Sequence, residues 1–128
     1  MYHVGVSDHI LVAHSLRGEA FGPAQRLHGA TYEVRVELLT PDVDEDGIVV
    51  DIGWLRDTLQ RALSPLNYQN LDSLPELAGA NTTTEFLARW IHGQLAARLG
   101  GRAGGRLRVT LVESPTAWAG YEEGLGTS

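Results

Sequence analysis

The sequence predicts an α+β domain in which two strands, two helices and two further strands follow one another along the chain (β-β-α-α-β-β). Apolar and polar residues alternate over 30–39 and 106–113, which is typical of strands with one buried face. Apolar residues instead recur at helical spacing over 51–63 and 82–99, which predicts two amphipathic helices. The length of 128 residues favours a single domain over residues 1–128.

The first two elements are predicted to be strands joined by a long loop. Residues 2–14 are rich in β-branched and apolar side chains, and Gly5 within this run, together with Ser7 and Asp8, indicates a bulge or a bend. Residues 15–29 contain glycine, proline and several polar residues, which predicts a loop. In the second strand, the side chains expected to face the core are Tyr32, Val34, Val36 and Leu38.

Two helices and an irregular segment form the middle of the predicted domain. Asp51 is expected to cap a helix that ends before Pro65, because proline disfavours helical backbone at the residue before it. Residues 66–81 carry no periodic pattern, so we expect irregular structure there. The letters TTTE predict a capping box between Thr82 and Glu85, which opens a second helix that stops at a glycine pair.

The last third of the chain is predicted to form a pair of strands. Residues 106–113 alternate clearly, and the segment SPT after them predicts a turn. Residues 117–123 then form a last short strand. We expect the tail at 124–128 to be frayed.

The composition excludes several classes of chemistry. The formal net charge of −6 argues against nucleic acid or an anionic membrane surface as the partner. The chain has no cysteine, so disulfides, thiolate nucleophiles and cysteine-bound zinc are excluded. It has no lysine either, which removes Schiff-base chemistry and a P-loop. No apolar run reaches spanning length and no signal sequence is visible, so we expect a cytoplasmic protein.

Five short segments stand out in order along the chain. They read ILVAHSL at 10–16, LHGATY at 27–32, GIVVDIGWLR at 47–56, NTTTEFLARWI at 81–91 and VTLVESPTAWAGY at 109–121. Together and in this order, they resemble the family of 6-pyruvoyl-tetrahydropterin synthase and 6-carboxy-tetrahydropterin synthase. No single segment is specific, whereas the ordered set of five is.

The resemblance implies a particular fold and assembly. The family adopts the tunnelling fold, a four-stranded antiparallel sheet with two helices on one face, assembled into oligomeric barrels. We therefore expect a core over about residues 2–122, and a homo-oligomer whose small-molecule sites lie between subunits. A sheet with open edges also needs covering, which fits such an assembly.

The chain departs from the family at its functional positions. The three zinc histidines of the family map to His14, His28 and Ala30. The family cysteine maps to Ala24. The aspartate and histidine that move protons in the family map to Asn67 and Tyr68 in the segment LNYQNLD. The proton relay of the family cannot run in its usual form with these residues.

Zinc is doubtful as a cofactor, and no other cofactor is expected. Catalytic zinc usually has three protein ligands and one open position. Residues two apart on a strand share a face, so positions 28 and 30 face the same site, but Ala30 has no ligand atom. Glu19 is the acidic residue of the 15–29 loop that could complete a set with His14 and His28. Otherwise the two histidines either line a pocket as polar residues or work as acid/base groups.

The ligand anchor of the family is retained. Glu113 maps to the glutamate that holds the pterin, and a carboxylate can accept two parallel hydrogen bonds from a planar N–C–NH₂ edge. Thr83 and Asn67 complete the expected substrate-binding set. Tyr68 is a candidate to donate a proton or to hold an oxyanion.

These observations favour a divergent enzyme of the family. It would perform metal-independent acid/base chemistry, of lyase or isomerase type, on a small polar ring or carbonyl substrate in specialised metabolism, with His14, His28 and Tyr68 as catalytic groups. One alternative is a non-catalytic paralogue with a structural role or with a bound pterin-like ligand. Another is a zinc-dependent synthase with an unusual third ligand, which would turn over dihydroneopterin triphosphate.

Overall fold

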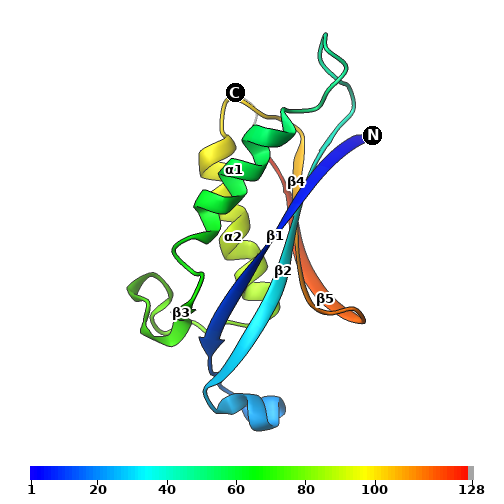
Figure 1. Ribbon diagram of the computed structural model, residues 1–128. Coiled ribbons are helices and arrows are strands. Elements are labelled where there is room, and N and C mark those ends of the chain that lie inside the picture. The colour runs from blue at the N-terminus through cyan, green and yellow to red at the C-terminus, as the bar shows by residue number, and fades with distance from the viewer. Residues whose placement is uncertain (127–128) are drawn as a thin grey trace.

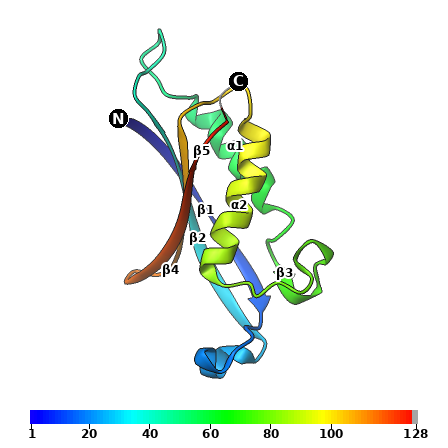
Figure 2. The same cartoon turned by 180° about the vertical axis from the view of Figure 1, so that it is seen from behind.

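The computed structural model describes residues 1–126 and confirms the α+β architecture. A curved sheet forms one layer, and the two long helices lie together on one of its faces, as Figures 1 and 2 show from opposite sides. The strands lie in the order β3-β1-β2-β4-β5. Four of them pair antiparallel as expected, and the two-residue strand β3 (Gln69–Asn70) adds a fifth, parallel to β1 (Tyr2–His14).

Strands β1 and β2 (His28–Thr40) form a long hairpin that places the two histidines opposite each other. Pairing is continuous along the hairpin and ends with His14 opposite His28. The bulge expected at Gly5 is therefore wrong. The glycine instead serves a close approach, because a Cβ at position 5 would lie 3.1 Å from the Cγ of Glu37 on the neighbouring strand.

The connection between these strands covers residues 15–27 and contains a 3₁₀ segment, η1 (Glu19–Gln25). A backbone hydrogen bond of 2.9 Å from the N–H of Leu16 to the carbonyl of Ala24 closes its base. No residue of η1 is buried, so the segment lies over the end of the sheet rather than inside the core. The loop prediction is confirmed, except that the second strand begins earlier than expected, at its histidine.

Strands β4 (Arg106–Ser114) and β5 (Ala117–Gly124) form a second hairpin, as predicted. Their pairing shifts register between Val112 and Ser114. The residue between them, Glu113, therefore lies in a bulge at the end of its strand. Bulges of this kind bend the strand and change the direction of a side chain.

Helix α1 (Ile52–Leu63) begins as the sequence predicts. The carboxylate of Asp51 accepts hydrogen bonds from the N–H groups of Gly53 and Trp54, which confirms the cap. The helix ends before Pro65, also as expected.

Helix α2 (Thr84–Leu99) begins one residue later than the predicted capping box requires. The cap is Thr83, whose hydroxyl accepts from the N–H of Phe86, so the box between Thr82 and Glu85 is wrong. Thr82 is buried, and its hydroxyl lies within hydrogen-bond distance of a histidine instead. A tertiary contact has moved the helix start by one residue.

The core fills the space between the helices and the sheet. The strand residues predicted to face it are all buried: Tyr32, Val34, Val36 and Leu38. Leu125 is also buried and its N–H donates to the carbonyl of Gly105, so the expected fraying does not begin at residue 124. Residues 127–128 of that tail lie outside the described residues. Within residues 1–126, no helix combines the length and apolar composition needed to cross a membrane.

Candidate functional site

A pocket of about 610 Å³ opens at the end of the sheet where the connection of residues 15–27 meets the beginning of α2. In Figure 1 this is the lower end of the molecule, where β1 ends, β2 begins and α2 starts. We call it the histidine pocket. The side chains with acid/base or hydrogen-bonding capacity that define it are His14, His28, Tyr32, Thr84 and Glu113. Thr83, predicted to bind substrate, also lines it.

The two imidazoles of the pocket lie next to each other, with ring centroids 4.7 Å apart. The Nδ1 atom of His28 lies 2.8 Å from the carbonyl oxygen of Arg26. A carbonyl oxygen only accepts, so Nδ1 of His28 carries a proton and donates. In the neutral ring, Nε2 is then left as an acceptor, and this nitrogen is the one able to bind or remove a proton.

The ring of His14 is more deeply enclosed. Its residue is only 2% exposed, and Nδ1 lies 3.0 Å from the hydroxyl oxygen of Thr82. Burial lowers the pKa of His14 from its ordinary value of 6.5, and the nearby His28 lowers it further, whereas Thr82 acts in the opposite direction. His14 is therefore neutral at pH 7.

A hydroxyl, a phenol and a carboxylate also line the pocket, and the Tyr32 ring lies edge-on to that of His14 with centroids 6.4 Å apart. The hydroxyl of Thr84 donates a hydrogen bond to Oε1 of Glu113. Each carboxylate oxygen has two lone pairs, so this bond leaves Glu113 able to accept two further hydrogen bonds from a planar ligand edge. Burial raises the pKa of the Tyr32 phenol above its ordinary value of 10.0, with a smaller contribution from the Glu113 charge. The phenol is therefore protonated at neutral pH and available as a donor.

The residues present in one chain do not fit a catalytic zinc ion. The third family position is Ala30, which lines the pocket without a ligand atom. Glu19, expected to complete the set, is exposed on η1 and is not among the pocket residues. Across residues 1–126, no three histidine, aspartate or glutamate side chains come together in a way that could hold a metal ion. Two imidazoles alone fall one ligand short of the usual catalytic set.

Asn67 and Tyr68 lie on the open edge of β1 and are not among the pocket residues. The carboxamide oxygen of Asn67 accepts a 2.9 Å hydrogen bond from the N–H of Leu11, and the N–H of Tyr68 donates to the carbonyl of Leu11. Tyr68 adopts a left-handed φ of 60°, and its residue is 78% exposed. Within one chain, the structure does not bring these two residues to His14 and His28. Their predicted roles stay predictions.

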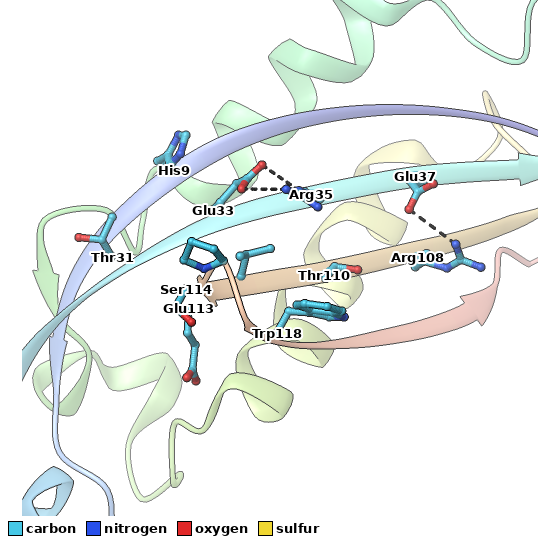
Figure 3. A pocket seen from close by; sticks show the side chains of 12 residues that line it. His9, Thr31, Glu33, Arg35, Glu37, Arg108, Thr110, Glu113, Ser114 and Trp118 are labelled. Atoms are coloured by element: carbon cyan, nitrogen blue, oxygen red, sulfur yellow. Dashed lines mark hydrogen bonds and ion pairs between the residues drawn. The ribbon is translucent and has the colours of Figure 1, made fainter.

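A second hollow, of about 740 Å³, lies on the face of the sheet away from the helices. Figure 3 shows that its charged side chains pair with each other, Glu33 with Arg35 and Glu37 with Arg108. His9 lines this hollow and is not among the residues of the histidine pocket. Figure 3 also shows the Glu113 side chain pointing away from these ion pairs. Glu113 lines both hollows, but its carboxylate accepts from the hydroxyl of Thr84, which lines only the histidine pocket, and we take that pocket as the candidate site.

Sequence reasoning missed several members of the site. Tyr32 was expected only in the core, although residues 28, 30 and 32 share one strand face and the spacing could have indicated it. Thr84 was expected only to help start a helix. Leu16 and Phe21 also line the pocket, and no periodic signal in their loop indicates this.

Comparisons with known proteins agree with the observed fold. Residues 3–124 match the model of a family described as 6-pyruvoyl tetrahydropterin synthase. The chain is similar to the structure of 6-pyruvoyl tetrahydropterin synthase from Caenorhabditis elegans, with 23% identity, a TM-score of 0.84 and 95% of each chain covered.

Two further structures show the same fold at lower identity. The synthase of the same name from Plasmodium falciparum is 19% identical, with a TM-score of 0.78 and coverage of 96% of this chain and 98% of that one. An uncharacterised protein from Wolinella succinogenes is 16% identical, with a TM-score of 0.70 and coverage of 94% and 97%. Together with the family match, these structures confirm the tunnelling fold.

Proposed function

The chain belongs to the 6-pyruvoyl tetrahydropterin synthase family, and we propose that it is a divergent enzyme that performs metal-independent acid/base chemistry on a pterin-like ring or a related small carbonyl compound. The observation that carries this proposal is the convergence of two adjacent imidazoles and one carboxylate on a single pocket. The carboxylate supplies recognition and the imidazoles supply proton transfer.

In this proposal, Glu113 anchors the substrate. Its carboxylate, held by Thr84, accepts two hydrogen bonds from a planar N–C–NH₂ edge of the ring. The reacting side chain of the substrate then lies toward the other end of the same pocket, where the histidines are.

Proton transfer falls to His28 and its neighbours. The Nε2 atom of His28 is the base, because the bond from Nδ1 to the carbonyl of Arg26 fixes this tautomer. The neutral ring of His14 holds a polar group of the substrate, and the phenol of Tyr32 is the nearest acid that burial keeps protonated. Whether the reaction is of the lyase or the isomerase type depends on which substrate bond breaks or forms after the proton is removed.

The test uses sepiapterin, a dihydropterin whose side chain carries a ketone. In D₂O with EDTA present, NMR follows exchange of the hydrogen next to that ketone. We expect exchange by the wild type and a loss of about 100-fold or more in His28→Ala, which is typical of the removal of a general base. His9→Ala, on the opposite face, is the matched control and keeps full exchange. Wild-type exchange that His28→Ala does not reduce would contradict the proposal.

Recognition by the carboxylate is measured separately. Glu113→Gln keeps the shape of the side chain but removes its charge and one acceptor, so binding of sepiapterin should weaken about 10- to 100-fold. Fluorescence titration measures this affinity.

A non-catalytic binding protein is the second candidate. The hydrogen bond from Thr84 to Glu113 favours both candidates equally, because it holds a group that recognises the ligand and takes no part in proton transfer. It predicts saturable binding of sepiapterin that Glu113→Gln weakens, with no exchange above background in the wild type. The same two measurements therefore separate the candidates. In both, we propose a homo-oligomer in which Tyr68 of one chain reaches the pocket of another.

A further inference from the structure

The part of the histidine pocket contributed by the connection of residues 15–27 is apolar. Leu16, Phe21 and Ala24 line it, and Ala30 on β2 continues this surface next to the histidines. The ring of Phe21 lies close to the backbone of Gly18, because a Cβ at position 18 would be 3.4 Å from this ring. A substrate anchored at Glu113 therefore meets hydrocarbon side chains at this part of the pocket.

The charged side chains that one chain contributes to the pocket all have one sign. Its charged side chains are Glu85 and Glu113, and among residues 1–126 no arginine lines it. The sequence contains no lysine that could supply a cation instead. The connection of residues 15–27 contains Arg17 and Arg26, and neither is among the pocket residues. The guanidinium of Arg17 donates to the carbonyl of Gly79.

A phosphorylated substrate would be poorly matched to this lining. Phosphate groups bind through charge-assisted hydrogen bonds from arginine or lysine, and two carboxylates repel them. The start of α2 offers a partial positive charge. However, the hydroxyl of Thr83 takes up one of its free N–H groups, and Glu85 and Glu113 lie at the same end with full negative charge.

We infer that the histidine pocket selects unphosphorylated substrates whose side chain is uncharged and partly apolar. This inference rests on the proposed function, because it assumes that the ring is anchored at Glu113. It names the substrate class for that site: a heterocycle with an N–C–NH₂ edge and a short neutral substituent. The polyphosphate ester that the zinc synthases of the family use falls outside this class.

The experiment compares two ligands that share a ring and a carbon skeleton, 7,8-dihydroneopterin and its 3′-triphosphate. Fluorescence titration at low salt measures both affinities for the wild-type chain. We expect the neutral ligand to bind at least about tenfold more tightly, and the difference to shrink in 0.5 M NaCl because salt screens the repulsion.

One variant should reverse the preference. Ala24→Arg places a guanidinium in the apolar lining, and we expect the ratio of triphosphate affinity to neutral-ligand affinity to rise about tenfold or more. Ala97→Arg is the matched control, since it adds the same charge on an exposed position of α2 near its other end. The control should change neither affinity.

The outcomes separate this inference from the proposed function. Tighter binding of the triphosphate by the wild type, weakened by Glu113→Gln, would overturn the inference and leave the anchor intact. Binding of neither ligand would overturn the proposed function and this inference with it. Equal affinities at low salt would also contradict the selection described here.

Discussion

At the scale of single residues, the environment of His14 determines its protonation. Desolvation and the adjacent His28 imidazole both lower its pKa, and the hydroxyl of Thr82 only partly opposes them. The unfolded chain has no such environment, so its histidine titrates near the ordinary value of 6.5. The folded and unfolded chains therefore bind different numbers of protons in weakly acidic solution.

This difference predicts a pH dependence of stability. Because the folded-state pKa is the lower one, stability is fully present above about pH 6.5 and is lost as the pH falls through the folded-state pKa. Urea denaturation between pH 5 and 8 measures the free energy of unfolding. His14→Gln keeps a partner for Thr82 without a titrating group, and we expect it to flatten this part of the profile.

The control for that measurement is His9→Gln on the exposed face of β1. It should leave the profile as it is in the wild type. If the free energy of unfolding of His14→Gln fell with pH as steeply as that of the wild type, groups other than His14 would be responsible for the loss of stability in acid.

At the scale of elements, the turn from α2 to β4 depends on backbone that only glycine adopts easily. Gly101 and Gly105 have φ values of 82° and 83°. A Cβ on Gly101 meets nothing, whereas one on Gly105 would overlap the carbonyl oxygen of Leu39 and lie 2.9 Å from the Cγ2 of Thr40. The two positions share a conformation but differ in the space around them.

This contrast gives a matched pair of variants. Gly101→Ala should lower the free energy of unfolding by about 1–2 kcal/mol, the cost of left-handed backbone in an alanine. Gly105→Ala adds overlap in a packed region and should cost about 1–3 kcal/mol more. Urea denaturation measures both, and equal losses would contradict the close approach to β2.

The sequence predicted the elements better than their contacts. Alternation identified β2 and β4, and it correctly placed Tyr32, Val34, Val36 and Leu38 in the core. The start of α2 was misplaced because a distant histidine uses the Thr82 hydroxyl, and no local pattern contains that information. The contact of Thr84 with Glu113 is likewise invisible, since the two residues are joined only by the tertiary fold.

At the scale of the whole molecule, the sheet leaves two edges uncovered. β5 is the last strand on one side, and on the other side β3 pairs with only two residues of β1. Trp118 on β5 and Leu11 on β1 are exposed near these edges. Uncovered strands with exposed apolar side chains favour association with further chains.

We therefore expect an oligomer in solution. Light scattering coupled to gel filtration should give a mass that is a multiple of the 13.9 kDa chain. Tyr68 is exposed at this edge, where its N–H donates to the carbonyl of Leu11. Tyr68→Ala should weaken the assembly or the exchange activity without unfolding the chain. A monomeric mass across the micromolar range would contradict the proposed shared site.

The continuous hairpin of β1 and β2 also determines the order in which the site can assemble during folding. Its two histidines are separated by a connection of residues 15–27, so closing that loop has a small entropic cost and brings the imidazoles together early. Glu113 joins only when β4 docks on β2, across a much longer stretch of chain. We therefore expect the two histidines to come together before Glu113 reaches them, and hydrogen exchange during refolding would show protection of the β1–β2 hairpin before that of β4.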